Sequence, residues 1–342
     1  MSSTAQRSIR RALVVANPAA GTYSAAVLRA VLDRCRDAAV AAEVLHTTGR
    51  GHATAHVEAR LAGPRPPHLV VAVGGDGTVR EVVKGLVAAA RGAPAPADAG
   101  AALFPVPAGT GNSTYLALWG HRPWADALHA VLRGDGARLR RLDLARLDSA
   151  PPEPARRDPG QAEPTRGGHR GEPVVLGACS GIVAEALVVA RSVAETGRAR
   201  YLTAFTRAAR DGKPYPGRVT VDGAVVYEGP TMLANVGGGR HRGGSYLLLP
   251  RSILDDGQLD VCVLSDSVAG ADIPDLIRHG AHLEHPGVHY ARGRRIGVTR
   301  LDGAPLAFEH DGELVTGAGT GFTLEVLAGA LPVWAPVEPP HG

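Results

Sequence analysis

Three short polar segments that contain glycine, all in the first third of the sequence, have residues suited to binding a polyphosphate. The most informative is GGDGT at residues 74–78, which follows an apolar run ending at Val73 and precedes a helix-like run. Glycine lets the backbone approach a ligand closely, and the free amide groups at a helix start form an anion site. NPAAG at residues 17–21 and PAGTGNS at residues 107–113 each follow another apolar run. In a parallel sheet such segments share one edge, so we expect them to converge on one nucleotide.

The Asp76 carboxylate is negatively charged and would be repelled by a phosphate group. We therefore expect its carboxylate either to orient the amide groups of the loop or to hold Mg²⁺ between phosphate oxygens. For GGDGT taken alone, an ordinary glycine-rich turn between a strand and a helix is the alternative.

The elements that position these segments follow from the spacing of apolar residues. Strands are predicted at residues 12–16, 42–46, 68–73 and 102–106, and helices at residues 24–38, 51–62 and 78–91. This alternation predicts an α/β N-terminal domain with a parallel sheet covered on both faces. From residue 138 onward strand-like runs follow in closer succession, which predicts a mainly antiparallel β-sandwich.

We accordingly divide the chain into a nucleotide-binding domain at residues 1–136, a β-sandwich domain at residues 137–328 and a C-terminal tail at residues 329–342 that returns to the first domain. Residues 149–172 are rich in proline, glycine and charge, so we expect a disordered insertion there.

Composition excludes several classes of protein. Of the 342 residues, 44% are hydrophobic and 20% charged, which excludes a wholly disordered or collagen-like chain. The three cysteines lack paired spacing, so we expect no disulfide scaffold and a reducing, cytoplasmic location. The net charge is only +4 and no basic stripe is interleaved with aromatic residues, so we expect no nucleic-acid partner. No apolar window is long enough to predict a membrane-spanning helix.

The three segments, in this order and at these intervals, resemble the catalytic domain of the diacylglycerol kinase family, which also contains sphingosine, ceramide and bacterial lipid kinases. Residues 235–264 resemble the second-domain segment of that family, and EHDGE at residues 309–313 resembles its DGE motif. The resemblance covers nearly the whole chain apart from residues 149–172. It implies ATP- and Mg²⁺-dependent phosphorylation of a hydroxyl group on a lipid, most simply diacylglycerol, in phospholipid metabolism.

The resemblance also implies site residues. Asp311 would be the general base that takes the proton of the acceptor hydroxyl, with Glu313 in the same pocket. A structural Mg²⁺ would bind the Asp256 carboxylate and the backbone carbonyls of Ile253 and Gln258. The residues implied for nucleotide binding are Asn17, Thr47, Gly74, Gly75, Asp76, Gly77, Thr78, Arg80, Gly109, Thr110, Gly111 and Asn112.

Three positions depart from the family's usual residues, namely Arg80, Ser113 and Val183. They leave the acceptor open: it is a lipid, or else NAD or a specialised small metabolite. They also permit a catalytically silent nucleotide-binding regulator. Arg80 is expected either to pair with a phosphate or to be a solvated helix residue.

Two further expectations concern binding partners and an alternative function as a hydrolase. Peripheral contact with the inner face of a membrane and a homodimer are both compatible with the sequence. Residues 177–181 have the outline of a nucleophile elbow around Cys179, but a small buried cysteine is the favoured interpretation.

Overall fold

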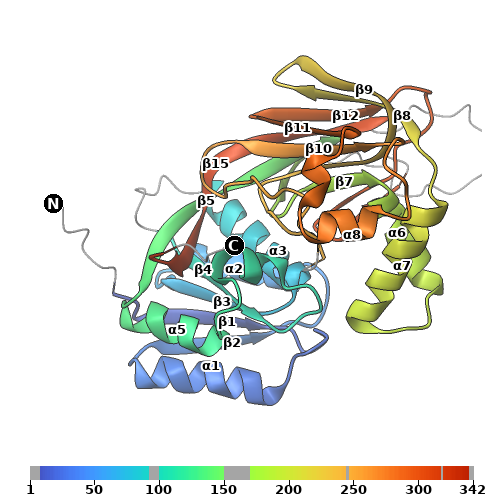
Figure 1. Ribbon diagram of the computed structural model, residues 1–342. Helices are drawn as coiled ribbons and strands as arrows, with labels where there is room; N and C mark the ends of the chain where they lie inside the picture. Colours follow the sequence, from blue (N-terminus) through green and yellow to red (C-terminus); the bar gives the residue numbers. More distant parts are fainter. Residues whose placement is uncertain (1–7, 92–99, 150–169, 244–245, 317–318, 339–342) are drawn as a thin grey trace, which may run out of the picture. The chain divides into compact units, whose positions relative to one another are not determined.

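The computed structural model describes residues 8–91, 100–149, 170–243, 246–316 and 319–338, and it divides into two compact units (Figure 1). The first unit comprises residues 1–142 and 329–342, and the second comprises residues 143–328. The first boundary thus follows Leu142, later than residue 136, where the character of the sequence changes.

The first unit is built on a parallel sheet. Its strands are β1 (Arg11–Ala16), β2 (Ala41–His46), β3 (Leu69–Gly74) and β4 (Ala102–Pro107), in the order β2-β1-β3-β4. The last part of β15 (Gly321–Pro336) adds to β4 in parallel, with Val333 opposite Leu103. Strands β1, β3 and β4 are buried almost throughout, as expected of parallel strands covered on both faces.

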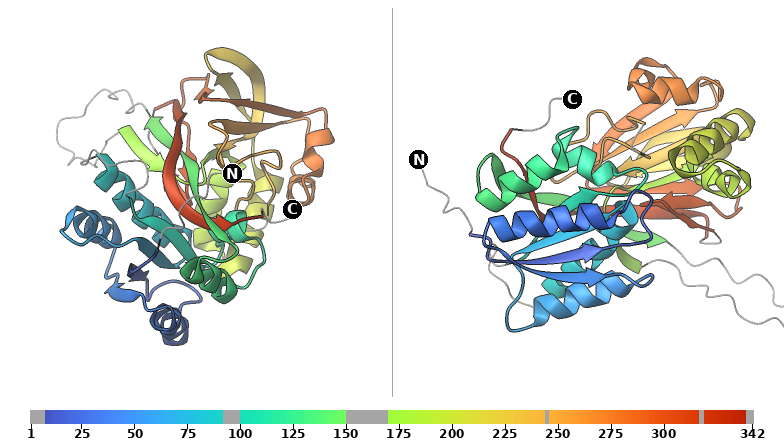
Figure 2. Two further views of the ribbon diagram at one scale, coloured as in Figure 1. Left: turned by 90° about the vertical axis from the view of Figure 1, so that its left-hand side faces the viewer. Right: turned by 90° about the horizontal axis from the view of Figure 1, so that it is seen from below.

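Among the described residues of this unit, five helices accompany the sheet. They are α1 (Ala25–Asp37), α2 (His52–Ala62), α3 (Asp76–Arg91), α4 (Ser113–Trp119) and α5 (Trp124–Arg133). Helix α1 packs against α5, and α2 packs against α3, and Figure 2 shows α1 and α2 on opposite faces of the strands. The predicted α/β architecture is confirmed, whereas α4 and α5 were not predicted.

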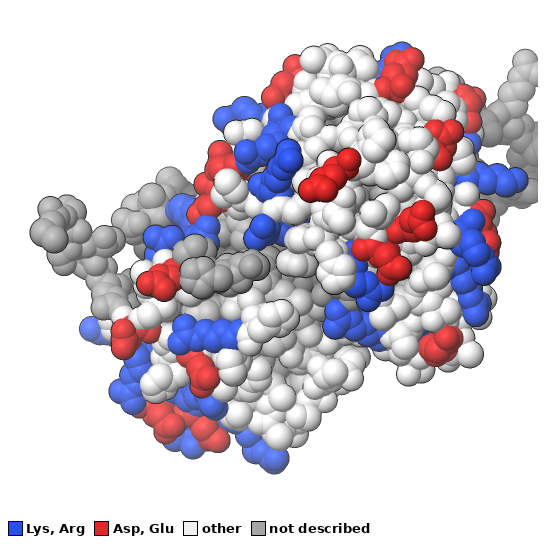
Figure 3. Space-filling model, in the orientation of Figure 1, with Lys and Arg blue, Asp and Glu red and all other residues white. Residues whose placement is uncertain are grey.

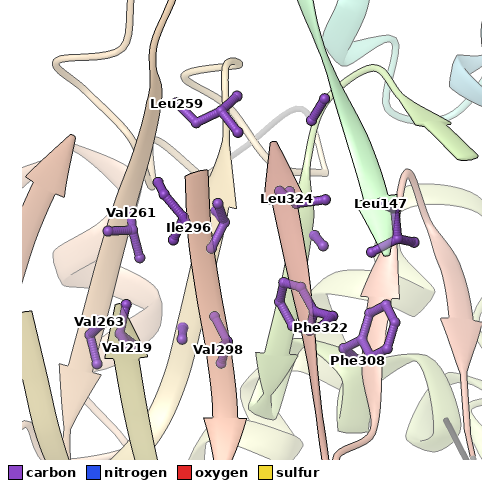
Figure 4. Packing of buried hydrophobic residues seen from close by; sticks show 14 of the residues in the cluster. Leu147, Val219, Leu259, Val261, Val263, Ile296, Val298, Phe308, Phe322 and Leu324 are labelled. Carbon is purple, nitrogen blue, oxygen red and sulfur yellow. The ribbon is translucent and has the colours of Figure 1, made fainter. Parts of the chain in front are cut away.

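The second unit is mostly antiparallel, as predicted. Its strands are the last part of β5 (Ala137–Ser149), β6 (Arg170–Val174), β7 (Ala178–Gly181), β8 (Tyr215–Val221), β9 (Ala224–Gly237), β10 (Leu259–Ser265), β11 (Val288–Gly293), β12 (Arg295–Arg300), β13 (Phe308–His310), β14 (Glu313–Val315) and the first part of β15. Along the sheet the order is β14-β13-β7-β9-β8-β12-β15, and β10 pairs with both β9 and β11. Their apolar side chains, including Leu147, Val261, Phe308 and Phe322, point toward one another in a common core (Figure 4).

Helices cover the other face of strands β7, β9 and β10. They are α6 (Ile182–Val189), α7 (Gly197–Asp211) and α8 (Ile273–Arg278), with short 3₁₀ turns η1 (Ala190–Ser192) and η2 (Ala281–Glu284). A second buried cluster joins them to the strands and includes Ile182, Phe205, Leu233, Cys262 and Ile277. The sequence interpretation missed these helices because it read the second domain as strands alone.

The proposed disordered insertion at residues 149–172 is too wide at both ends. Ser149 ends β5 and Arg170 begins β6, and Gly171 and Asp148 join the two strands through a hydrogen bond of 3.1 Å from the Gly171 amide. Residues 150–169 lie outside the described part of the chain.

Acidic and basic side chains are interspersed on the face that Figure 3 shows. Within the described ranges, none of the helices has the length and apolar character needed to cross a membrane.

Candidate nucleotide and catalytic sites

The three glycine-containing loops of the first unit meet at the carboxyl edge of the parallel sheet. Asn17 follows β1 and donates its side-chain amide to Thr78 Oγ1 at 3.0 Å, which ties the first loop to the second. The backbone amide of Ala108, after β4, donates to Gly74 O at 2.9 Å, which ties the third loop to the second. A Cβ built on Gly21 would lie 3.3 Å from Thr110 Oγ1, so the first and third loops also touch. The loops expected to share a nucleotide are therefore brought together.

Two glycines allow the second and third loops to pack backbone against backbone. A Cβ on Gly109 would lie 2.2 Å from Gly75 Cα, and one on Gly75 would lie 3.0 Å from Gly109 Cα. Real Cβ atoms do not approach other atoms at the first of these distances, so the loop contact requires glycine at residue 109, whereas a side chain on Gly75 would require Gly109 to shift. Packing of the two loops therefore accounts for Gly109, and contact of Gly75 with phosphates stays a prediction.

Gly77 is different because it faces open space. It is exposed in the first turn of α3, and a Cβ there would meet nothing within 4 Å. The first amide groups of a helix have no carbonyl partner within that helix and carry the positive end of its dipole. The amides of Thr78 and Val79 donate to Gly75 O at 3.0 and 3.1 Å, so Gly77 leaves the backbone of Asp76 and Gly77 open to an anionic ligand.

Asp76 holds the start of a neighbouring helix. Its Oδ2 accepts from the amide of Ser113 at 3.0 Å, and its Oδ1 accepts from the amide and the hydroxyl of Thr114 at 3.0 and 3.1 Å. Asn112, the residue before α4, makes no such cap with its own side chain. Of the two roles expected for Asp76, the orientation of loop amides is the one that these contacts support.

Replacing Asp76 by alanine is expected to destabilise the chain. The substitution leaves the first amide groups of α4 without their charged acceptor, which costs about 1–3 kcal/mol in the free energy of unfolding. Chemical denaturation of the purified variant measures this difference. An unchanged free energy of unfolding would contradict the capping role.

Other residues of the expected nucleotide site are held mainly by the protein itself. The side chain of Asn112 accepts from Gly109 N and donates to Gly109 O, both at 2.9 Å, and thereby closes the third loop around Gly111. Thr47 follows the edge strand β2, and its amide donates to Ala16 O at 2.9 Å. Arg80 is only 5% exposed on α3, so the interpretation of Arg80 as a solvated helix residue is wrong. Nucleotide contact by any of these residues stays a prediction.

Asp311 lies in the second unit, in a two-residue turn between β13 and β14. Asp311 and Gly312 have φ values of 48° and 82°, the left-handed conformations that D-G adopts in tight hairpins. The carboxylate is 6% exposed and faces the backbone of the segment before β7. Its Oδ2 accepts from Val175 N at 2.9 Å, and its Oδ1 accepts from Leu176 N at 2.7 Å and Gly177 N at 3.4 Å. Asp311 is thus both a turn residue and a fixed, oriented carboxylate.

Buried polar residues that the sequence interpretation did not single out surround this turn. Glu309 is 3% exposed and its Oε2 accepts from Gly312 N at 2.8 Å. Arg242 donates from Nε to Asn235 Oδ1 at 2.9 Å. Burial raises the pKa of Glu309, and the nearby Arg242 charge opposes that rise. The only sequence signal for Glu309 was its place two residues before Asp311.

The expected structural metal site lies on the loop between β9 and β10. Asp256 Oδ1 accepts from Gln258 N at 3.0 Å, and its Oδ2 contacts the Arg292 guanidinium, while Ile253 is 49% exposed. Carboxylate and carbonyl oxygens are ligands that suit a hard cation. However, Arg292 already contacts one Asp256 oxygen, so these residues do not fit Mg²⁺ as they stand. In the part of the chain that the structure describes, no three His, Cys, Asp or Glu side chains form a metal cluster.

Asp143, on β5, is a further carboxylate of this loop that the sequence interpretation overlooked. It accepts from Gly257 N at 2.6 Å, and its own amide donates to Leu254 O at 2.8 Å. Because Asp143 lies in a strand 114 residues before Gly257, the sequence near either residue does not predict this contact.

Cys179 lies in β7 and is fully buried. Burial raises the pKa of its thiol well above the ordinary value, so the reactive thiolate is disfavoured. These properties confirm the interpretation of Cys179 as a small buried residue and argue against a hydrolase built on it.

Comparison with known proteins adds two family matches. Residues 11–146 match the model of the diacylglycerol kinase catalytic domain, and residues 177–335 match the YegS C-terminal NAD kinase beta sandwich-like domain. Among curated protein sequences, none matches the chain significantly.

Solved structures with the same fold come from Bacillus anthracis str. Sterne. One, provisionally described as a diacylglycerol kinase, is 23% identical with a TM-score of 0.71, and the match covers 95% of this chain and 97% of that one. Another, described as a diacylglycerol kinase, is 20% identical with a TM-score of 0.65, over 95% and 96% of the two chains. At these identities the likeness concerns the fold.

Proposed function

Because the chain belongs to the family of the diacylglycerol kinase catalytic domain, we propose that it transfers the γ-phosphoryl group of ATP to a hydroxyl group of a lipid. Diacylglycerol is the expected acceptor. The observation that carries this proposal is the meeting of three glycine-containing loops after β1, β3 and β4, with Gly77 open at the start of α3.

In this proposal the first unit binds ATP. The amide groups at the start of α3 bind phosphate oxygens, and Thr110 reaches the nucleotide from the third loop. Mg²⁺ enters with ATP as part of the substrate and neutralises charge on its phosphates. Backbone donors suit this task because they are fixed before the nucleotide arrives and need not reorganise during the reaction.

The second unit supplies the general base. Asp311 Oδ2 accepts one hydrogen bond, from Val175 N, and a carboxylate oxygen has two lone pairs, so capacity to accept a proton remains. As the acceptor oxygen bonds to the γ-phosphorus, its proton passes to Asp311 and the bond from that phosphorus to the β–γ bridging oxygen breaks. ADP leaves with the electron pair of the broken bond. Glu313, which begins β14, is assigned to the same site as Asp311 in this proposal.

Incubation of the purified chain with γ-³²P-labelled ATP and Mg²⁺ tests the proposal. One arm contains diacylglycerol in mixed micelles, and the other contains NAD and a mixture of polar metabolites. We expect label in the organic phase of the first arm and none in a new product of the second. Label on a polar metabolite would show that the acceptor is that metabolite and not a lipid. Nucleotide binding without transfer in either arm would favour a catalytically silent regulator.

A peripheral membrane location belongs to the same proposal, since the expected acceptor resides in a bilayer. Cosedimentation with vesicles that contain diacylglycerol measures this association. Recovery of all the protein in the supernatant would contradict it.

A further inference from the structure

A row of buried polar and thiol side chains crosses the sheet next to the Asp311 turn. Glu309 on β13 lies opposite Cys179 on β7, which lies opposite Asn235 on β9, which lies opposite Cys262 on β10. Directly opposed residues share one face of a sheet. This face is the one that α6, α7 and α8 cover, and Phe308 points to the opposite core (Figure 4). Glu309 is thus a carboxylate at one end of a buried row that also contains Asn235 and two thiols.

Arg242 is the cation that accompanies Glu309. Its Nη1 lies 3.9 Å from Glu309 Oε1, and both side chains are less than a tenth exposed. The same guanidinium donates to Asn235 Oδ1 at 2.9 Å and to Val236 O at 3.5 Å. Arg242 therefore connects β9 to the carboxylate of Glu309.

The pair also contacts the backbone that binds Asp311. A Cβ built on Gly177 would lie 2.5 Å from Arg242 Nη2 and 2.1 Å from Val236 O, so the guanidinium packs directly on Gly177. Gly177 in turn accepts from Asp311 N at 3.2 Å and donates to Asp311 Oδ1. At the second residue of the turn, Glu309 accepts from the amide of Gly312. Both residues of the turn are consequently held by this group of contacts.

A buried ion pair contributes little net stability, because the loss of solvation offsets much of the attraction between its charges. Its presence beside the turn is therefore better explained by a role other than stability. We propose that Glu309 and Arg242 are positioning residues that hold the Asp311–Gly312 turn against residues 175–177 and thereby fix the direction of the Asp311 carboxylate. This inference rests on the proposed function, in which Asp311 is the base.

The test compares Glu309→Leu, Glu309→Gln and Arg242→Lys with Val298→Ala. Glutamine keeps an oxygen that can accept from Gly312 N, leucine does not, and lysine keeps the charge of Arg242 without its fork of donors. Val298 is buried in the apolar core of the same unit and serves as the control for a loss of stability alone. If Glu309→Leu does not fold, Glu309→Gln and Arg242→Lys still make the comparison.

We expect kcat for lipid phosphorylation to fall about 100-fold in Glu309→Leu, because a displacement near 1 Å at a reacting group has an effect of that order. The KM for ATP should stay within about twofold, since the pair does not belong to the nucleotide loops. Glu309→Gln should recover most of the lost kcat, and Arg242→Lys should lie between the two. A kcat for Glu309→Leu equal to that of Val298→Ala would overturn the proposal.

Amide hydrogen exchange provides a readout that does not depend on catalysis. We expect faster exchange of the amides of residues 175–177 and 312 in Glu309→Leu and Arg242→Lys than in Val298→Ala. Unchanged exchange at these amides would overturn the positioning role even in an active enzyme. Conversely, faster exchange in a chain that phosphorylates no lipid would support the positioning role while the proposed function fails.

Discussion

Replacement of Gly77 by alanine should weaken ATP binding while making the chain slightly more stable. Gly77 lies in the first turn of α3 without a left-handed φ, and its Cβ would enter open space. Alanine in a helix is favoured over glycine by about 0.5–1 kcal/mol, so the free energy of unfolding should rise by that order. In the proposed site the added methyl group occupies the space of phosphate oxygens. We expect the dissociation constant for ATP to rise at least about tenfold, equivalent to about 1.4 kcal/mol.

Calorimetric titration and chemical denaturation of the same preparation measure the two quantities. Gly100→Ala is the matched control because a Cβ there also meets nothing within 4 Å, and Gly100 lies before β4 rather than in a candidate loop. Gly109→Ala provides the opposite case, since its Cβ would collide with Gly75, and it should lose stability and binding together. Unchanged ATP affinity in Gly77→Ala would remove the start of α3 from the nucleotide site.

Replacement of Asp311 by asparagine should abolish phosphoryl transfer and spare nucleotide binding. Asparagine cannot take the proton of the acceptor hydroxyl, and loss of a general base lowers kcat by about 10²–10⁴-fold. The dissociation constant for ATP should not change, because the nucleotide loops belong to the other unit. Single-turnover transfer from labelled ATP and a binding titration measure the two effects.

The substitution also has a structural effect that needs a control. The asparagine NH₂ group cannot accept from the amides that the carboxylate now binds, and an unmet buried donor costs about 1–3 kcal/mol. Asp222→Asn is matched to it: Asp222 also precedes a glycine in a two-residue hairpin turn, has a φ of 50° and accepts from the amides of Arg294 and Arg295. Full kcat in Asp222→Asn beside loss of kcat in Asp311→Asn would assign the effect to the base. Full kcat in Asp311→Asn would refute its role.

The first unit follows from its sequence more fully than the second. Residues 69–73 and 12–16 are continuous apolar runs followed by glycine or polar turns, and such runs specify buried parallel strands with little ambiguity. In the second unit, α6 begins as Ile182-Val183-Ala184, a β-branched, apolar segment that local preference also allows as a strand. Burial of this segment against β9 and α7 favours the helix over a strand, and those contacts are not local in sequence.

The candidate site was likewise predictable only in part. The order of the loops around Asn17, Gly75 and Gly109 was predictable because strand ends in a parallel sheet share an edge. The capping of α4 by Asp76 and the packing of Gly75 on Gly109 could not be predicted, because both contacts depend on the distance between two loops. Glu309 and Arg242 are 67 residues apart, and no spacing rule connects them.

Amide hydrogen exchange with and without a non-hydrolysable ATP analogue tests the central claim most directly, since that claim assigns the triphosphate to backbone groups of three loops. We predict that the analogue, with Mg²⁺, slows exchange in residues 75–79 and 109–112 and in the loop after Asn17. The same experiment on Gly77→Ala should show this protection only at higher analogue concentration. Saturating analogue that leaves all three loops unprotected, or that protects other segments instead, would contradict the account.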